Sequence, residues 1–294
     1  MKEVKVQKLL NIRDSVWGFS NLVEESLILN LKEIIRQIPK EKFMQYSRLL
    51  KYALMSNSKK LDDDIFQSEP IQKIISIFEN KSIVEVIGNL LFESNTDIIQ
   101  HIEYKNIISD MANKNELIQQ ISHSKHKLTQ LKSKQVNFWR NTPIFPKKKI
   151  EDFILSQNSI PYIPSFEFSR IEKGGCIQPH TDVSRKIASI MIYLPQNQEQ
   201  RDSSLGTIFW KPKDLMGNRA FSNNIENSSK QLWDEEYEAF KRESCSPIYT
   251  KFQDQYTLIF FRSNTSWHSF QYNQNDIGPR FSLNINFNFP EISQ

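Results

Sequence analysis

The sequence predicts an α+β protein in which a helical N-terminal region precedes a β-sandwich or β-barrel. Residues 1–150 carry apolar side chains at three- and four-residue spacing, which is typical of one face of a helix. Residues 151–294 instead contain short runs of β-branched and aromatic residues that turn residues separate. Many short strands after a helical block favour a sandwich or barrel with helices packed on one side.

Three segments of the first region show the helical pattern most clearly. A first helix is expected to end at Pro39, on the apolar positions Leu27, Leu31, Ile34, Ile35 and Ile38. A second is expected over residues 41–55, on Phe43, Tyr46, Leu50 and Leu54. Ser68 is expected to be the N-cap of a third helix, with Pro70 in its first turn.

The second region alternates strands and turns until an insertion interrupts the series. The strand-like runs are SFEFSRI, ASIMIYLP, GTIFW, PIYTKF, YTLIFF, SWHSFQY and RFSLNINFNF. Between the third and fourth runs, residues 213–246 hold a polar loop followed by a segment of helical character. Long excursions between core strands are often functional lids, so we expect this insertion to cover a substrate.

Composition excludes several classes of protein. A hydrophobic content of 38% and a charged content of 24% exclude a wholly disordered chain, and a net charge of +4 does not by itself indicate nucleic acid. The two cysteines form no CxxC pair, which favours a reduced, cytoplasmic or otherwise intracellular setting. No apolar run is long enough to span a membrane. The basic stretch 125–149, with eight basic and no acidic residues, is interpreted either as a solvated helix face and loop or as an anion-binding patch.

Two of the five histidines lie in or beside strand-like runs and suggest a metal site. His180 forms His-x-Asp with Asp182, and residues two apart in an extended segment point to the same side. His268, from a later strand, could supply a second imidazole. Two histidines and one carboxylate form the facial triad of non-haem Fe(II) oxygenases, which leaves three coordination positions open.

The last strand adds an anion-binding pair and an unusual distribution of polarity. Arg280 and Ser282 form Arg-x-Ser, and an arginine fork with a neighbouring hydroxyl suits a carboxylate. One face of this strand is polar from Arg280 to Asn288, and the other is apolar from Phe281 to Phe289. We expect either the usual apolar face inward or a polar lumen, the latter if the N-terminal helices cover the apolar outer face.

In these residues the second region resembles the Fe(II)/2-oxoglutarate-dependent oxygenases. The motif residues occur in the family's order, and the resemblance covers roughly residues 160–290. It implies a double-stranded β-helix (jelly-roll, cupin-like) core in residues 151–294, with the helical region 1–150 packed on the major sheet. It also implies Fe(II) on His180, Asp182 and His268, and 2-oxoglutarate on Arg280, Ser282 and Tyr193, with O2 as the second co-substrate.

The function that this resemblance implies is oxidation of an unactivated C–H bond in a small molecule such as an amino acid derivative. Hydroxylation, desaturation and oxidative cyclisation all stay open, whereas related halogenases have Gly or Ala in place of Asp182. Candidate substrate contacts are the polar and aromatic residues close to the motif in sequence, namely Gln178, Arg185, Arg262, Asn264 and Trp267.

Three alternative functions are open at this point. A protein or peptide hydroxylase would present a groove beside the iron. A nucleic-acid demethylase usually carries a second arginine six residues after the first, and this chain has Asn286 there, so nucleic acid is not an expected partner. A jelly-roll protein that binds ligands without catalysis is the third, because fold does not determine function. The sequence does not indicate an oligomeric state.

Overall fold

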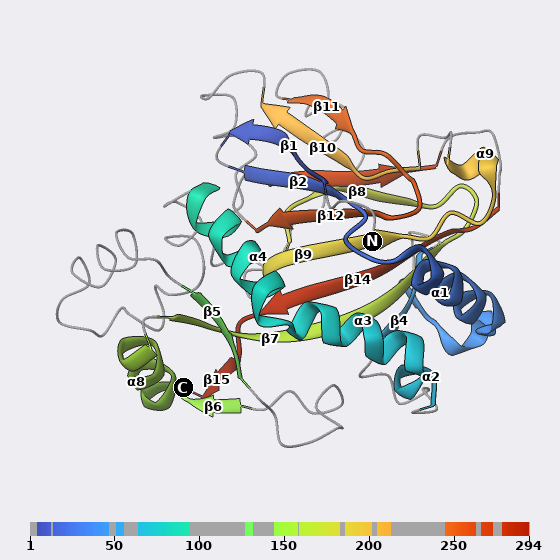
Figure 1. The fold of residues 1–294 in the computed structure, drawn as a ribbon. Helices are drawn as coiled ribbons and strands as arrows, with labels where there is room; N and C mark the ends of the chain where they lie inside the picture. Colours follow the sequence, from blue (N-terminus) through green and yellow to red (C-terminus); the bar gives the residue numbers. More distant parts are fainter. Residues whose placement is uncertain are drawn as a thin grey trace.

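The computed structural model describes residues 5–12, 14–46, 51–55, 64–94, 127–131, 144–157, 159–182, 186–201, 205–212, 245–262, 266–272 and 278–293. Their centre is a pair of facing antiparallel sheets (Figure 1). The eight core strands are β7 (Ser159–Ile171), β8 (Cys176–His180), β9 (Lys186–Tyr193), β10 (Ile208–Pro212), β11 (Cys245–Tyr249), β12 (Tyr256–Phe261), β13 (His268–Gln271) and β14 (Arg280–Asn288).

The order of these strands is that of a double-stranded β-helix. The major sheet contains β12-β9-β14-β7 and the minor sheet β11-β10-β13-β8, so the chain crosses repeatedly from one sheet to the other. The jelly-roll core predicted from the resemblance is therefore confirmed, as are the seven strand-like runs. Strand β8 was not predicted as a strand, because five residues with a proline and a glutamine show no clear alternation.

The N-terminal region is not helical throughout, and one predicted helix is wrong. Over residues 41–55 the structure has the strands β3 (Met44–Tyr46) and β4 (Lys51–Met55), which join the major sheet beside β7. At the opposite edge, β1 (Lys5–Ile12) and β2 (Asp14–Ser20) form a hairpin on β12. Pairing at the sheet edges satisfies backbone N–H and C=O groups that would otherwise be exposed. This pairing stabilises the strand conformation although the apolar residues have a helical spacing. A domain boundary near residue 150 stays a prediction.

Strand β14 has a polar inner face and an apolar outer face, which confirms the polar-lumen interpretation for this strand, whereas Leu258 and Phe260 of β12 add apolar side chains to the same inner face. Ser189 lies opposite Asn286, and Tyr193 opposite Ser282, so these polar side chains share the lumen face. The alternate residues Phe281, Leu283, Ile285 and Phe287 are buried in one cluster with apolar side chains from the helices. The helices thus bury the apolar outer face of β14, which would otherwise be exposed to water.

Three helices make this outer layer, as Figure 1 shows in front of β9, β14 and β7. They are α1 (Glu25–Gln37), α3 (Glu69–Glu79) and α4 (Lys81–Ser94). Helix α1 confirms the first predicted helix, and Leu31 and Ile35 are fully buried on its inner face. Ser68 occupies the predicted N-cap position of α3, but its hydroxyl donates to the carbonyl of Ile65 rather than capping the helix.

Seven further elements are described. They are η1 (Lys40–Lys42), α2 (Asp64–Gln67), β5 (Lys127–Gln130), β6 (Ile144–Pro146), α8 (Lys147–Gln157), α9 (Gln198–Arg201) and β15 (Glu291–Ser293). Nearly all of the predicted lid 213–246 and much of the basic stretch 125–149 lie outside the described residues, so both stay predictions. Among the described helices, none has the length and apolar character needed to cross a membrane.

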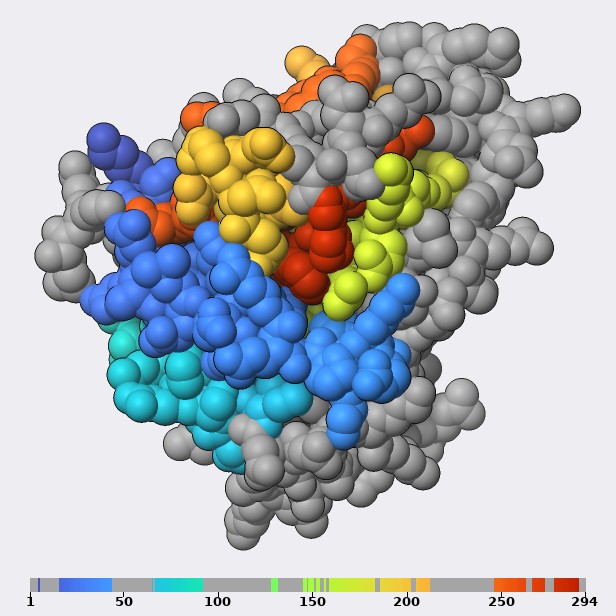
Figure 2. Space-filling model, turned by 90° about the vertical axis from the view of Figure 1, so that its right-hand side faces the viewer, coloured from blue at the N-terminus to red at the C-terminus, as the bar shows by residue number. Residues whose placement is uncertain are grey.

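An ion-pair network around the buried Lys32 joins α1 to α9 and to the segment before β12. Lys32, which is 4% exposed, donates to Asp254 at 2.9 Å, and Arg201 contacts the other carboxylate oxygen of Asp254 at 2.5 Å. Beside it, Arg36 hydrogen-bonds the side chain and the carbonyl of Gln196. Figure 2 shows α1 between α3 and the segment around α9, the position that these contacts maintain.

We expect Asp254→Ala to lower the free energy of unfolding by roughly 3 kcal/mol, because it leaves the Lys32 ammonium buried without its carboxylate. Urea unfolding followed by circular dichroism measures this. Glu69→Ala is the control, since it removes an exposed pair with Lys73 and should leave the free energy of unfolding nearly unchanged. Equal, small losses for both variants would show that the buried network does not stabilise the docking of α1.

Candidate metal centre

The two strand histidines come together because they form a cross-strand pair. His180 is the last residue of β8 and lies directly opposite His268, the first residue of β13. Directly opposed residues in an antiparallel pair place their side chains on the same face, here the lumen. The two ring centroids are 4.3 Å apart. Strand register alone thus accounts for two of the three predicted ligands.

Asp182 completes the cluster from the segment that follows β8. One potential ligand atom from each of His180, Asp182 and His268 lies within 4.8 Å of the others. Asp182 and His268 are buried, and His180 is partly buried. Among the described residues this is the one cluster of three or more such side chains, and it is the predicted triad.

Both imidazoles are oriented by backbone carbonyls. Nδ1 of His180 is 2.8 Å from the carbonyl oxygen of Gln178, and Nδ1 of His268 is 3.0 Å from that of Ser266. Because a carbonyl only accepts, each Nδ1 carries the proton and the lone pair lies on Nε2. Metal-binding histidines commonly donate their other ring N–H to a backbone carbonyl in this way.

The electrostatics keep His180 and Asp182 in the forms that bind metal. Burial, aided by His268, lowers the pKa of His180 to about 3, so its imidazole is neutral at pH 7. Burial alone would raise the pKa of Asp182, but Lys186 and the two imidazoles outweigh it and hold that pKa below its ordinary value. A neutral imidazole and an ionised carboxylate are the ligand forms.

A second group of predicted residues lies around Arg280, the first residue of β14. This guanidinium is 1% exposed and its Nε donates to the carbonyl of Leu205 at 2.7 Å. Its Cζ lies over the rings of Phe270, Tyr193 and Phe252, at 4.5, 5.3 and 5.4 Å from their centroids. Burial lowers the pKa of Arg280, but an arginine stays charged at neutral pH.

One nitrogen of this guanidinium has no hydrogen-bond partner among the described residues. Nη2 of Arg280 is fully buried, and no described donor or acceptor satisfies it. A buried charged group with an open donor is costly unless an anion completes it. The residue therefore fits the distal carboxylate of 2-oxoglutarate, as the resemblance implied.

Tyr193 and Ser282 lie beside Arg280 with their hydroxyl groups already engaged. The hydroxyl of Tyr193 donates to Oγ1 of Thr207 at 2.7 Å and lies 3.0 Å from Oγ1 of Thr250. Ser282 donates to Asn284 at 3.1 Å. Sequence reasoning missed Thr207 and Thr250, although Thr207 lies in the GTIFW run that it had singled out. A direct contact of Tyr193 or Ser282 with 2-oxoglutarate stays a prediction.

Three of the five predicted substrate residues lie in the described part of the chain, and two lie outside it. Arg262 is fully buried, and its Nε donates to the backbone carbonyl of Asp182 at 3.1 Å, so it holds the backbone of this predicted ligand. Trp267 is buried, and Gln178 is half-buried with its amide 3.8 Å from Sγ of Cys176. Arg185 and Asn264 lie outside the described residues.

Gly206 permits the close approach on which the Arg280 site depends. A Cβ at this position would lie 1.9 Å from the carbonyl oxygen of Thr250, which is backbone and cannot rotate away. The neighbouring Leu205 carbonyl and the Thr207 hydroxyl are the groups that contact Arg280 and Tyr193.

We therefore expect Gly206→Ala to destabilise the protein by roughly 1–3 kcal/mol through overpacking and to weaken 2-oxoglutarate binding as residues 205–207 shift. Urea unfolding and calorimetric titration measure the two effects. Gly88→Ala is the matched control, because its Cβ would meet nothing closer than 3.7 Å. Unchanged 2-oxoglutarate affinity in a folded Gly206→Ala protein would contradict the role of this segment.

Comparison with known proteins gives distant structural similarity only. No protein-family model and no curated protein matches the chain. The chain is similar to a prolyl-4-hydroxylase of Pseudomonas putida, with 11% identity, a TM-score of 0.45, and coverage of 93% of this chain and 92% of that one. It is also similar to the epimerase SnoN in complex with Fe3+, alpha ketoglutarate and nogalamycin RO, with 9% identity, a TM-score of 0.46, and coverage of 94% and 80%. HygX of Streptomyces hygroscopicus, with nickel and 2-oxoglutarate bound, matches at 7% identity and a TM-score of 0.41, over 93% and 82%.

The chain's own residues thus carry the resemblance. The resemblance to the Fe(II)/2-oxoglutarate oxygenases rests on the chain's core strand order, its His-Asp-His cluster and its buried arginine. Asn286, which occupies the position of the second arginine of the nucleic-acid demethylases, lies on the lumen face 3.2 Å from the hydroxyl of Ser189.

Proposed function

We propose that this chain is an Fe(II)/2-oxoglutarate-dependent dioxygenase that oxidises an unactivated C–H bond of a small molecule. One observation carries the proposal. The same lumen holds a cluster of two imidazoles and a carboxylate, and a fully buried arginine with an open donor. A jelly roll that served only as a scaffold would need neither feature.

The residues present fit both groups. His180, Asp182 and His268 would hold the metal, and this ligand set favours non-haem Fe(II). Arg280 would bind the distal carboxylate of 2-oxoglutarate through Nη2. When bound, the iron and 2-oxoglutarate together supply O2 activation, with succinate and CO2 as co-products.

The protein's contribution is to orient the groups and to exclude water. Gln178 and Ser266 orient the two imidazoles through their backbone carbonyls. Phe252 and Phe270 enclose the Arg280 guanidinium and keep water from it, which strengthens its attraction for a carboxylate. Thr207 and Thr250 hold the Tyr193 ring against the same guanidinium.

For hydroxylation, substrate, 2-oxoglutarate and O2 give hydroxylated substrate, succinate and CO2. One oxygen atom enters the new C–OH bond and the other enters the succinate carboxylate. Desaturation and oxidative cyclisation use the same co-substrates and release water. An amino acid derivative is the substrate class we propose, with Gln178, Arg185, Arg262, Asn264 and Trp267 as its candidate contacts.

The test is iron-dependent formation of succinate from 2-oxoglutarate. The C–H substrate need not be known, because the slow conversion of 2-oxoglutarate to succinate without substrate can be measured by isotope release or mass spectrometry. We expect succinate only when Fe(II), 2-oxoglutarate and O2 are all supplied to the folded protein. A folded protein that forms no succinate with any metal supplied would instead favour a non-catalytic binding protein, whether or not Arg280 binds 2-oxoglutarate.

A further inference from the structure

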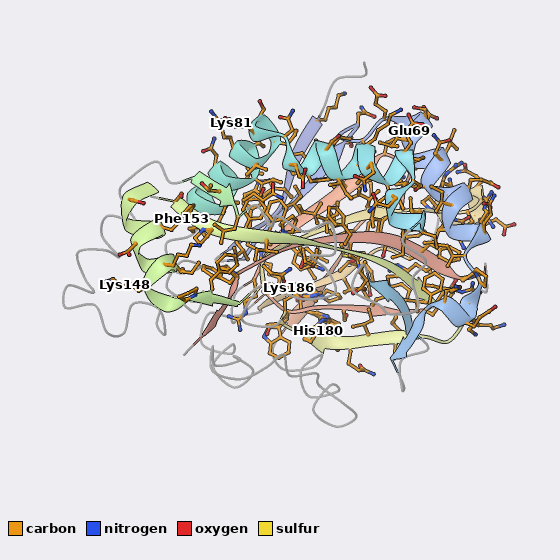
Figure 3. All side chains as sticks on the ribbon, turned by 90° about the horizontal axis from the view of Figure 1, so that it is seen from below. Glu69, Lys81, Lys148, Phe153, His180 and Lys186 are labelled. Carbon is orange, nitrogen blue, oxygen red and sulfur yellow. The ribbon has the colours of Figure 1, made fainter. Side chains whose placement is uncertain are left out.

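Lys186, the first residue of β9, contacts a predicted metal ligand although the sequence motif does not include it. Its Nζ lies 2.7 Å from Oδ1 of Asp182. Figure 3 labels Lys186 and His180 near one another at the same end of the barrel. The Lys186 side chain is 23% exposed, so the ammonium is neither a free surface charge nor a fully buried one.

The second oxygen of the same carboxylate is held by Ser189. The hydroxyl of Ser189 donates to Oδ2 of Asp182 at 2.7 Å and lies 3.2 Å from Oδ1 of Asn286. Lys186 and Ser189 both come from the first half of β9, and Nζ and Oγ are 3.5 Å apart. Together with the bond from Arg262 to the Asp182 carbonyl, three separate side chains hold this residue.

We propose that Lys186 and Ser189 are positioning residues that clamp the Asp182 carboxylate, one on each oxygen. A carboxylate offers about four lone-pair positions, two on each oxygen. A donor on each oxygen uses one of the two and opposes rotation about the Cβ–Cγ bond. Asp182 then presents a single oxygen to the metal beside His180 and His268.

This inference rests on the proposed function, and it explains how the site would keep enough open positions. A triad whose carboxylate used one oxygen would leave three metal positions open. 2-Oxoglutarate and O2 would need these open positions. A carboxylate free to chelate through both oxygens would take a fourth position and compete with 2-oxoglutarate.

The alternative is that Lys186 acts only through its charge, and the two roles predict opposite signs. An ammonium next to a metal site repels a divalent cation, so removing the charge alone would tighten metal binding. Loss of a positioning partner instead weakens binding, by about 10- to 100-fold for outer-shell partners of metal ligands.

The experiment is calorimetric titration of Co(II) alone into the metal-free full-length protein, with the visible d–d spectrum of the complex. We expect Lys186→Met and Ser189→Ala each to weaken Co(II) binding by roughly tenfold and to change the spectrum. Lys186→Gln, which retains a donor without the charge, should stay within about threefold of the wild type, inside the spread of such effects. Lys73→Met is the matched control, because its ammonium lies 2.6 Å from an exposed carboxylate far from the triad in sequence.

The outcomes separate this inference from the proposed function. Tighter Co(II) binding by Lys186→Met, or an unchanged affinity and spectrum in both variants, would overturn the clamp while leaving the triad intact. Absence of Co(II) binding by the wild type itself would instead overturn the metal site. If Lys186→Met does not fold, Ser189→Ala alone tests the clamp. This variant removes a neutral hydroxyl, so no change in charge opposes the expected loss of Co(II) affinity.

Discussion

His268→Ala is expected to abolish iron-dependent turnover, lowering the rate by more than roughly 10³-fold. The imidazole is one of three proposed ligands, and its strand partner His180 cannot replace it because His180 is itself another of the three. His180→Ala should have the same effect. Succinate formation and Fe(II) content after desalting measure the two consequences separately.

The control for these variants is His126→Ala, a histidine that the motif does not include. It should retain wild-type turnover and metal content. Circular dichroism must show that each variant is folded. Full turnover in a His180/His268 double variant would contradict the triad.

Arg280→Ala is expected to raise the concentration of 2-oxoglutarate needed for half-maximal turnover by about 100-fold, because a buried charge partner is lost. The metal affinity should stay unchanged, since Arg280 contacts Leu205, Tyr193, Phe252 and Phe270 rather than the triad. Titration of 2-oxoglutarate into the metal-loaded protein without O2 gives the binding constant directly.

A 2-oxo acid without a distal carboxylate provides the specificity control. The wild type should prefer 2-oxoglutarate to 2-oxovalerate, and Arg280→Ala should lose this preference because only the distal carboxylate needs the guanidinium. Arg36→Ala, a half-exposed arginine on α1, should leave the preference unchanged. A preserved preference in Arg280→Ala would show that another group binds the carboxylate.

The sequence identifies the ligand residues because their chemistry is rare in this chain. Five histidines leave few possible pairs, and the His-x-Asp and Arg-x-Ser spacings place their members on common faces of extended segments. The alternation in β14 similarly indicates a polar lumen once helices are available to cover the apolar face. The residue pattern of a segment is sufficient to predict a feature that depends on that segment alone.

Features that depend on long-range pairing could not be predicted in this way. The strands β3 and β4 owe their conformation to β7, more than a hundred residues later, and their apolar spacing suits a helix equally well. The Lys32–Asp254 pair joins residues 222 apart. Lys186 and Ser189 lie only four and seven residues after Asp182, but they belong to no motif, so the sequence alone does not indicate their contacts with its carboxylate.

The most direct test is anaerobic addition of Fe(II) and then 2-oxoglutarate to the metal-free protein, observed by visible absorption. The proposed site predicts a weak charge-transfer band of the iron chelate that requires His180 and that weakens in Arg280→Ala. A folded protein that binds neither Fe(II) nor 2-oxoglutarate and shows no band would contradict the assignment of this lumen as an iron and 2-oxoglutarate site.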